Sequence, residues 1–278
     1  MMPEEYAAGR HPSSPDNWSV VRERLKAGEY VIGMTVTSNN VETGAYAATL
    51  GFHFLWCEME HSSLSLESLR TLVLATRGLP APVFARVPWA ELWLAKRVLD
   101  QGVQGVIFPF VSTVERARIA AQGCHYPPFG RRGSGAGLAV ATWPASGNYY
   151  DSADANVLVV CVIEEACGVE QIEAIAATPG IDVLFIGVSD LSFSLGLRGR
   201  QDEPVLDEAI AKIVSAAKRN GKWLGRPAGN AEEVKRFHEQ GFQFFQSVTE
   251  LGLMRIGARS LLDPLGIKEK PREQSTFY

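Results

Sequence analysis

Short apolar runs alternate with amphipathic segments along most of this chain. Eight of these runs are of strand type, and a helical pattern follows each of them: residues 30–36, 53–58, 82–87, 105–108, 157–163, 182–187, 222–225 and 242–247. Two of the helix starts carry capping-box spacing, Ser112 with Glu115 and Asn230 with Glu233. Eight strand-helix units in succession predict an α/β protein with a single (β/α)8 TIM barrel.

The alternation occupies residues 17–265, which we expect to form one barrel domain because no Pro/Ser/Gly-rich linker divides the middle. Residues 1–16 lack periodicity and are predicted to be a flexible N-terminal segment, and residues 266–278 a C-terminal tail. An irregular stretch, 124–156, interrupts the rhythm after the fourth unit. A stretch of this length usually covers a site or makes a subunit contact.

The charge pattern narrows the choice of partners. The formal net charge is -4 and basic residues are scattered, so nucleic acid is not an expected partner. No apolar run approaches the roughly 18 residues that cross a bilayer, and the N-terminus has no signal-peptide pattern. We therefore expect a cytoplasmic protein without a membrane partner. The four cysteines show no C-x-x-C spacing and are expected to be reduced thiols in the core.

Two carboxylates follow neighbouring predicted strands. Glu164 closes the run that ends at Ile163, and Asp190 comes shortly after the next run, with one crossover helix between them near residues 169–177. The carboxyl ends of parallel strands line one face, so we expect both acids in one pocket. Two hard oxygen ligands suit Mg²⁺ or Mn²⁺. The alternative is that both acids only cap local turns and helices.

The second and third predicted strands bring further polar groups to the same face. Glu58, Glu60 and His61 follow one strand, and Arg86 ends the next. An imidazole exchanges protons near neutral pH, and either Glu58 or Glu60 can orient it. Arg86 is a permanent cation that suits a developing oxyanion. The alternatives are a surface histidine and a rim ion pair between Arg86 and these acids.

Lysine placement excludes one kind of carbonyl chemistry. A Schiff-base aldolase needs a lysine that projects into the pocket. The eight lysines fall on predicted helices, in the tail or, for Lys222, at the entry end of the seventh strand. Carbonyl chemistry in this barrel would therefore depend on the metal.

Taken together, six segments resemble the HpcH/HpaI family of class II pyruvate aldolases, a branch of the phosphoenolpyruvate/pyruvate TIM-barrel superfamily. The resemblance covers about residues 22–262. Its segments are Glu-Met-Glu-His-Ser (58–62), Arg-Val-Pro-Trp (86–89), Lys-Arg-Val-Leu-Asp-Gln-Gly-Val-Gln-Gly-Val (96–106), Tyr-Pro-Pro-Phe-Gly-Arg-Arg-Gly (126–133), Ile-Glu (163–164) and Phe-Ile-Gly-Val-Ser-Asp-Leu-Ser (185–192).

The resemblance implies a lyase that cleaves or forms a 4-hydroxy-2-oxo acid, giving pyruvate and an aldehyde through a metal-bound enolate. It implies that Glu164 and Asp190 hold Mg²⁺ or Mn²⁺, with Co²⁺ or Zn²⁺ as alternatives. The expected partners are a small oxo acid, an aldehyde and further copies of the chain. Members of the family usually assemble as trimers or hexamers that exchange their last helix, here near residues 249–262.

The resemblance also implies roles for the remaining residues. Arg86 would steady the enolate oxygen, and His61, with Glu58 or Glu60, would handle the proton of the 4-hydroxyl group. The backbone amides of the segment Gly187, Val188 and Ser189 would hold the pyruvate carboxylate.

The chain departs from the family's pattern where the aldehyde half is shaped and protonated. Glu58 replaces the usual Asp, Val162 the usual Gln, Val188 the usual Pro, and Thr35 a frequent aromatic residue. A second hypothesis is therefore decarboxylation of oxaloacetate, or carbon–carbon bond formation of the kind macrophomate synthase performs, which needs Arg86 but not the altered dyad. A third is a non-catalytic barrel that binds a keto acid.

Overall fold

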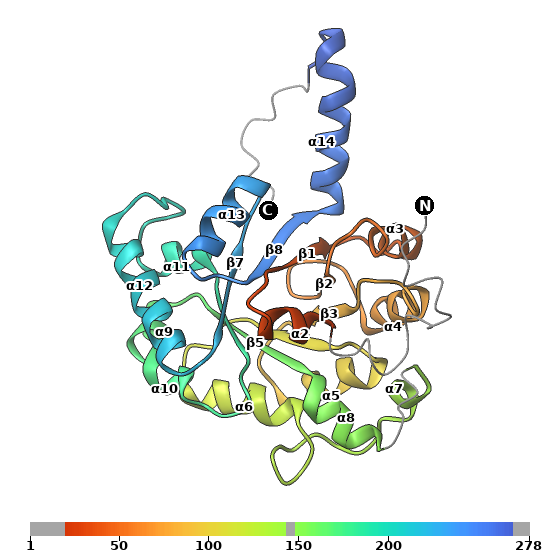
Figure 1. Ribbon diagram of the computed structural model, residues 1–278, viewed down its shortest axis with the longest axis vertical. Helices are drawn as coiled ribbons and strands as arrows, with labels where there is room; N and C mark the ends of the chain where they lie inside the picture. Colours follow the sequence, from red (N-terminus) through yellow and green to blue (C-terminus); the bar gives the residue numbers. More distant parts are fainter. Residues whose placement is uncertain (1–19, 143–147, 269–278) are drawn as a thin grey trace.

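The computed structural model describes residues 20–142 and 148–268. Within these ranges, eight parallel strands close into a barrel in chain order (Figure 1). The strands are β1 (Val31–Val36), β2 (Phe54–Glu58), β3 (Val83–Arg86), β4 (Gly105–Phe108), β5 (Leu158–Ile163), β6 (Val183–Ile186), β7 (Trp223–Pro227) and β8 (Phe244–Thr249). The predicted TIM barrel is confirmed. The predicted segment 1–16 lies outside the described residues, as does all of the predicted tail beyond residue 268.

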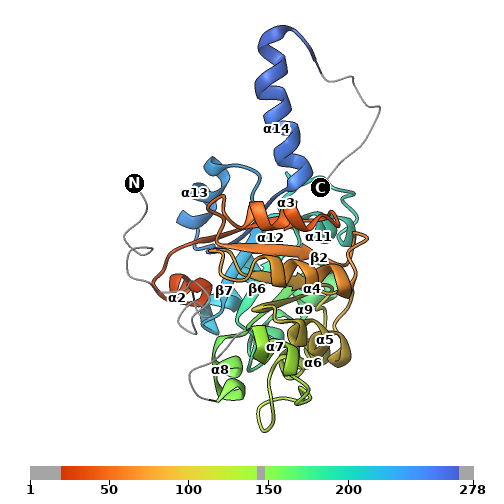
Figure 2. The ribbon, with the colours of Figure 1, turned by 90° about the vertical axis from the view of Figure 1, so that its right-hand side faces the viewer.

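Helices surround the barrel (Figures 1 and 2). They are α2 (Val20–Lys26), α3 (Val41–Ala47), α4 (Leu66–Ala75), α5 (Leu92–Gln101), α6 (Val114–Cys124), α7 (Gly137–Thr142), α8 (Tyr149–Asn156), α9 (Ala166–Glu170), α10 (Ile172–Ala176), α11 (Val188–Ser194), α12 (Pro204–Arg219), α13 (Ala231–Glu239) and α14 (Glu250–Leu262). The predicted crossover helix near 169–177 is thus two short helices, α9 and α10. The stretch 124–156 is less irregular than expected, because it contains α7 and α8.

Large aromatic side chains fill the barrel interior. Phe54 and Phe244 stack with ring centroids 4.7 Å apart, and Phe54 lies 4.9 Å from Phe84. Gly33 on β1 faces this stack, and a Cβ atom there would lie 2.2 Å from the Phe54 ring. The barrel interior at the amino ends of the strands is therefore a packed core, so any site must lie at the carboxyl ends of the strands.

Local capping confirms one of the two predicted helix starts. Asn230 caps α13 by accepting a hydrogen bond from the Glu233 amide at 2.8 Å. The other prediction was wrong by one residue, since Thr113 caps α6 and accepts from the Arg116 amide at 3.2 Å. The Ser112 hydroxyl instead donates to the Glu165 carboxylate after β5. Ser112 therefore ties the ends of two neighbouring strands together.

The last helix, α14, stands away from the barrel (Figures 1 and 2). Its first residue, Glu250, is buried and accepts hydrogen bonds from the amides of Thr37 and Ser38 after β1. Most of the helix after Glu250 is exposed. Its exposed apolar side chains include Leu251, Met254, Ile256 and Leu261. The helix therefore exposes to solvent an apolar surface of the kind that is normally packed against another element or another protein.

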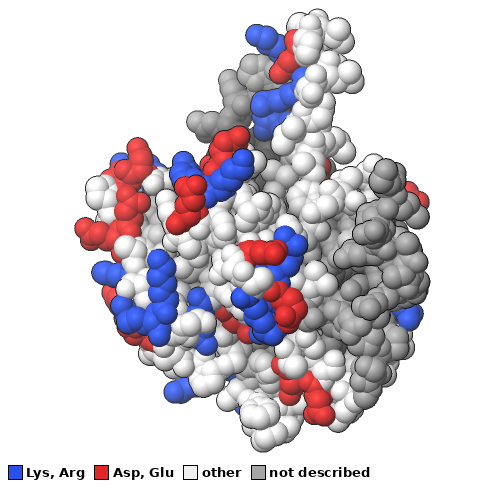
Figure 3. Space-filling model, in the orientation of Figure 1, with Lys and Arg blue, Asp and Glu red and all other residues white. Residues whose placement is uncertain are grey.

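Two further features concern the surface and the thiols. On the face shown in Figure 3, acidic and basic side chains are interspersed. No helix among the described residues is long and apolar enough to cross a membrane. The four cysteines are free; Cys57, Cys124 and Cys161 are buried as expected, whereas Cys167 on α9 is exposed.

Candidate active site

Glu164 lies at the carboxyl end of β5 and is 2% exposed. Its Oε1 accepts a hydrogen bond of 2.7 Å from the amide of Phe110, which follows β4. Burial raises the pKa of Glu164 to about 7; the Phe110 amide and the Arg86 guanidinium oppose this rise, and the Asp190 carboxylate adds to it. The carboxylate thus sits in a poorly solvated place where a positive charge would be stabilising.

Asp190 lies in the first turn of α11, at the carboxyl end of β6. Gly187, between the strand and this helix, packs directly on Glu164: a Cβ atom at position 187 would lie 2.6 Å from Glu164 Oε2. Any other side chain would push the Glu164 carboxylate aside. The sequence predicted Gly187 as an amide donor, but its N–H already donates to Ile163 O at 3.1 Å, so its missing side chain is the more important feature.

Glu58 is buried, and its carboxylate accepts hydrogen bonds from several side-chain and backbone groups. It pairs in register with Arg86 across β2 and β3, and the Arg86 Nε lies 2.8 Å from Glu58 Oε2. Glu58 Oε1 accepts from the amides of Glu60 at 2.9 Å and His61 at 3.1 Å, and Oε2 accepts from Trp56 Nε1 at 3.2 Å. Both oxygens are thus engaged, and Glu58 holds Arg86 and the turn that follows β2.

Glu60, not Glu58, lies beside the His61 side chain. Glu60 Oε2 is 3.5 Å from His61 Nε2 and 2.9 Å from Arg86 Nε. This oxygen is buried and accepts no hydrogen bond from the residues that the structure describes. Burial raises the pKa of Glu60 to about 7; Arg86 opposes the rise, and Glu164, Glu58 and Asp190 add to it. The predicted acids and cation therefore share one electrostatic environment.

The donor set suits a hard divalent cation. Glu164 and Asp190 offer carboxylate oxygens, and their mutual repulsion is the kind of charge that such an ion neutralises. Among the described residues, no three His, Cys, Asp or Glu side chains gather at ligand spacing. Two carboxylates fit Mg²⁺ or Mn²⁺, because Mg²⁺ keeps several waters, but they fall short of the three protein ligands usual in a catalytic zinc site.

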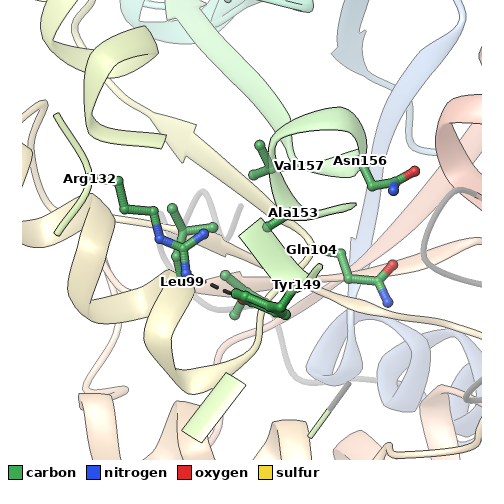
Figure 4. A pocket seen from close by; sticks show the side chains of 8 residues that line it. Leu99, Gln104, Arg132, Tyr149, Ala153, Asn156 and Val157 are labelled. Carbon is green, nitrogen blue, oxygen red and sulfur yellow. Dashed lines mark hydrogen bonds between the residues drawn. The ribbon is translucent and has the colours of Figure 1, made fainter. Parts of the chain in front are cut away.

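The pocket in Figure 4 is a separate place. It lies where α5 and α8 approach the residues before β4 and β5. In its wall, Arg132 Nη2 donates a hydrogen bond of 3.4 Å to the Tyr149 hydroxyl oxygen. Arg132 is buried and also pairs with Asp100 at 3.1 Å. These groups tie the stretch 124–156 to α5, at the amino ends of the strands. Arg132 and Tyr149, the residues of the stretch that make these contacts, therefore lie at the end of the barrel opposite the candidate site.

Sequence reasoning missed two supports of the site. Trp56 lies in the second apolar run and was not among the predicted site residues, yet its indole N–H donates to Glu58. Phe110 was not singled out, because a backbone amide leaves no trace in side-chain patterns. Alternation along β2 carried the only available signal, since Trp56 and Glu58 are two residues apart and face the same side of the strand.

Comparison with known proteins identifies the family. The HpcH/HpaI aldolase/citrate lyase family matches residues 32–255. The chain is 31% identical to the hydroxypyruvate/pyruvate aldolase of Paraburkholderia phytofirmans, over 87% of this chain and 95% of that protein. It is 35% identical to the 5-keto-4-deoxy-D-glucarate aldolase of Escherichia fergusonii, over 86% of this chain and 93% of that protein.

A solved structure agrees with this assignment. The HpcH/HpaI aldolase/citrate lyase family protein from Burkholderia cenocepacia J2315 superposes with a TM-score of 0.80 at 29% identity, covering 88% of this chain and 98% of that one. The chain therefore belongs to the HpcH/HpaI aldolase/citrate lyase family. It is a carbon–carbon lyase of the aldolase type.

Proposed function

We propose that the enzyme cleaves a 4-hydroxy-2-oxo acid reversibly to an aldehyde and pyruvate or hydroxypyruvate, at the carboxyl end of the barrel. The observation that carries the proposal is the position of Glu60: its Oε2 lies 2.9 Å from Arg86 Nε and 3.5 Å from His61 Nε2. Glu164 and Asp190 are close enough to raise its pKa. A base, a cation and two candidate ligands thus act on one another in a chain whose relatives are aldolases.

Glu164 and Asp190 are the residues that would hold the cation, with Mg²⁺ or Mn²⁺ as the proposed ion and Co²⁺ as an alternative. When bound, the cation supplies Lewis acidity that draws electrons toward the 2-oxo group of the substrate. Gly187 keeps the Glu164 carboxylate in place by leaving room for it. The buried setting makes Glu164 a more effective ligand, because little water competes for its carboxylate.

Arg86 is proposed to stabilise the negative charge that develops on the enolate oxygen. Its Nε lies against Glu58 and Glu60, while its terminal nitrogens make no hydrogen bond to the residues that the structure describes. These N–H groups remain for the substrate. A single donor at a developing oxyanion contributes ~3 kcal/mol to transition-state stabilisation.

His61 and Glu60 are proposed to move the proton of the 4-hydroxyl group. The imidazole is partly exposed and Glu60 Oε2 lies 3.5 Å from its Nε2. His61 would take the hydroxyl proton as the C3–C4 bond breaks, and Glu60 would stabilise the resulting imidazolium. Glu58 is not the partner in this proposal, because Arg86, Trp56 and two amides already use its oxygens.

The substrate carboxylate is proposed to bind the amides of Val188 and Ser189. They open α11, and the first amides of a helix have no acceptor within it. The Gly187 amide is engaged with Ile163 and takes no part. Anions are stabilised at such a helix start.

The test compares pyruvate release from 5-keto-4-deoxy-D-glucarate with decarboxylation of oxaloacetate, with Mn²⁺ and then with excess chelator. We expect faster cleavage of the hydroxy-oxo acid, which chelator stops. Faster turnover of oxaloacetate would favour the decarboxylase hypothesis instead. No turnover of either compound by folded protein would favour a barrel that only binds its ligand.

We also propose that the enzyme is a homo-oligomer, a trimer or hexamer, in which α14 packs on another copy of the chain. Leu251, Met254 and Leu261 lie three and seven residues apart and so form one stripe, and each is more than half exposed. A cytoplasmic setting is proposed with it, because unpaired cysteines are usual in a reducing compartment.

Light scattering after size exclusion tests this assembly. The wild type should be a trimer or hexamer, and Met254→Asp should shift it toward the monomer. Val205→Asp is the matched control, because Val205 is also an exposed apolar residue but lies on α12. A monomeric wild type, or equal effects of the two variants, would contradict the proposal.

A further inference from the structure

The backbone of Phe110 has an unusual conformation next to Glu164. Its φ angle is 51°, in the left-handed region that bulky residues rarely adopt. In this conformation its N–H points at Glu164 Oε1, at 2.7 Å. A strained backbone persists only where its surroundings hold it. The question is therefore which contacts hold the Phe110 peptide against the Glu164 carboxylate.

Arg116, in the first turn of α6, holds the other end of this residue. Its Nη1 donates to Phe110 O at 2.8 Å. The guanidinium carbon lies 4.2 Å from the centroid of the Trp89 ring, which in turn lies 5.7 Å from the ring of Phe110. A planar guanidinium can stack on an aromatic ring and donate hydrogen bonds in its plane at the same time. Arg116 thus clamps Phe110 between α6 and the Trp89 indole.

The clamp has a consequence for the two oxygens of Glu164. Oε1 is occupied by the Phe110 amide, while Oε2 faces the space that the absent side chain of Gly187 leaves. With one oxygen fixed, the carboxylate cannot rotate freely about its last bond. Groups that orient a ligating side chain in this way change metal affinity about 10- to 100-fold when they are lost.

We propose that Arg116 and Phe110 are positioning residues that fix the rotation of the Glu164 carboxylate and thereby set its affinity for a divalent cation. This inference rests on the proposed function, in which Glu164 is a metal ligand. Neither residue touches the substrate in it: Arg116 acts through the Phe110 carbonyl, and Phe110 through its amide.

Arg116→Met tests the guanidinium, because methionine keeps an unbranched stem and removes the donor. The readout is the Mn²⁺ dissociation constant from electron paramagnetic resonance of free Mn²⁺, which needs no turnover. We expect binding about 10-fold weaker in Arg116→Met, with partial recovery in Arg116→Lys, which keeps a donor. Arg118→Met is the control on the same helix. Arg118 is exposed, and its ion pair with Glu115 is long, with Nη1 3.9 Å from Glu115 Oε2. Its loss should leave the Mn²⁺ dissociation constant unchanged. Wild-type affinity in Arg116→Met would overturn the role of Arg116.

A second pair of variants tests the backbone and remains informative if Arg116→Met does not fold. Phe110→Gly and Phe110→Ala both remove the ring and keep the amide, but only glycine adopts a positive φ without strain. We expect Mn²⁺ to bind more tightly to Phe110→Gly than to Phe110→Ala by several-fold. Equal constants for the two variants would overturn the claim that the left-handed backbone positions Glu164.

One further variant separates this inference from the proposed function. Glu164→Gln should abolish Mn²⁺ binding at this site. If the wild type binds Mn²⁺ and Glu164→Gln does not, while Arg116→Met binds as the wild type does, only the positioning role fails. If Glu164→Gln binds Mn²⁺ as tightly as the wild type, the ligand assignment fails and the positioning role fails with it.

Discussion

Arg86 Nε lies 2.8 Å from Glu58 Oε2, and the two residues stand opposite each other at the ends of β3 and β2. The pair does more than neutralise charge. Glu58 also accepts the amides of the next turn, so the same carboxylate fixes both the cation and the segment that carries His61. Glu58 is therefore a support of the site and not the partner of the imidazole.

Loss of Glu58 should destabilise the protein. Glu58→Ala leaves the Arg86 guanidinium, only 12% exposed, without its closest carboxylate, and it leaves two turn amides without an acceptor. We predict that the free energy of unfolding in urea falls by about 3 kcal/mol, the cost of breaking a buried pair. Glu60→Ala removes a neighbouring acid whose Oε2 accepts no hydrogen bond from the described residues, and should cost far less. Equal losses would contradict this division of roles.

His61 should matter for bond cleavage more than for enolisation. In the proposed reaction the imidazole removes the 4-hydroxyl proton, which is absent from pyruvate itself. We predict that His61→Ala slows aldol cleavage much more than it slows exchange of the pyruvate methyl protons. Both rates are measured on one preparation, so unfolding would lower them together. Equal losses in a folded variant would argue against the assigned proton transfer.

Asp190 should be needed for the cation and not for the fold. It lies in the first turn of α11, partly exposed, so removal of its carboxylate leaves no cavity in the core. We predict that Asp190→Ala loses metal-dependent turnover while its thermal unfolding, measured with chelator present, stays near that of the wild type. Retained turnover at wild-type metal affinity would contradict the assignment of Asp190 as a ligand.

Stability should depend on pH through Glu60. Its pKa rises from an ordinary 4.5 to about 7 in the folded protein, mainly through burial. A raised pKa adds stability that is complete below the unfolded value of 4.5 and is lost as pH rises through 7. With chelator present, the melting temperature of Glu60→Gln minus that of the wild type should therefore increase as the pH rises from 5 to 8. A constant difference over that range would contradict the buried setting of Glu60.

The barrel was predictable because each level of the sequence agreed with the others. The eight apolar runs coincide with β1 to β8 within a few residues, since strands buried on both faces are mostly apolar. Local detail was less certain. The start of α6 was misplaced by one residue, because Ser112 and Thr113 are both good caps and only the fold shows that Ser112 is taken by Glu165.

The site was predictable only as a set of residues. The strand ends predict that Glu164, Asp190 and Arg86 lie at one face of the barrel, because parallel strands bring their carboxyl ends together; their roles at that face stay predictions. The sequence leaves open which acid faces His61, because the answer depends on a turn in which the Glu58 carboxylate accepts hydrogen bonds from the amides of Glu60 and His61. The positive φ of Phe110 could not be predicted from the sequence either, because phenylalanine rarely adopts this conformation and no pattern indicates where it does.

The most direct test of the account is NMR-detected exchange of the pyruvate methyl protons in D₂O. The substrate needs no aldehyde, so the experiment isolates formation of the enolate at the site of Arg86, Glu164 and Asp190. We predict exchange with Mg²⁺ or Mn²⁺ that stops with excess chelator and is lost in Asp190→Ala. No exchange with either ion in folded wild-type protein would contradict enolate chemistry at this site.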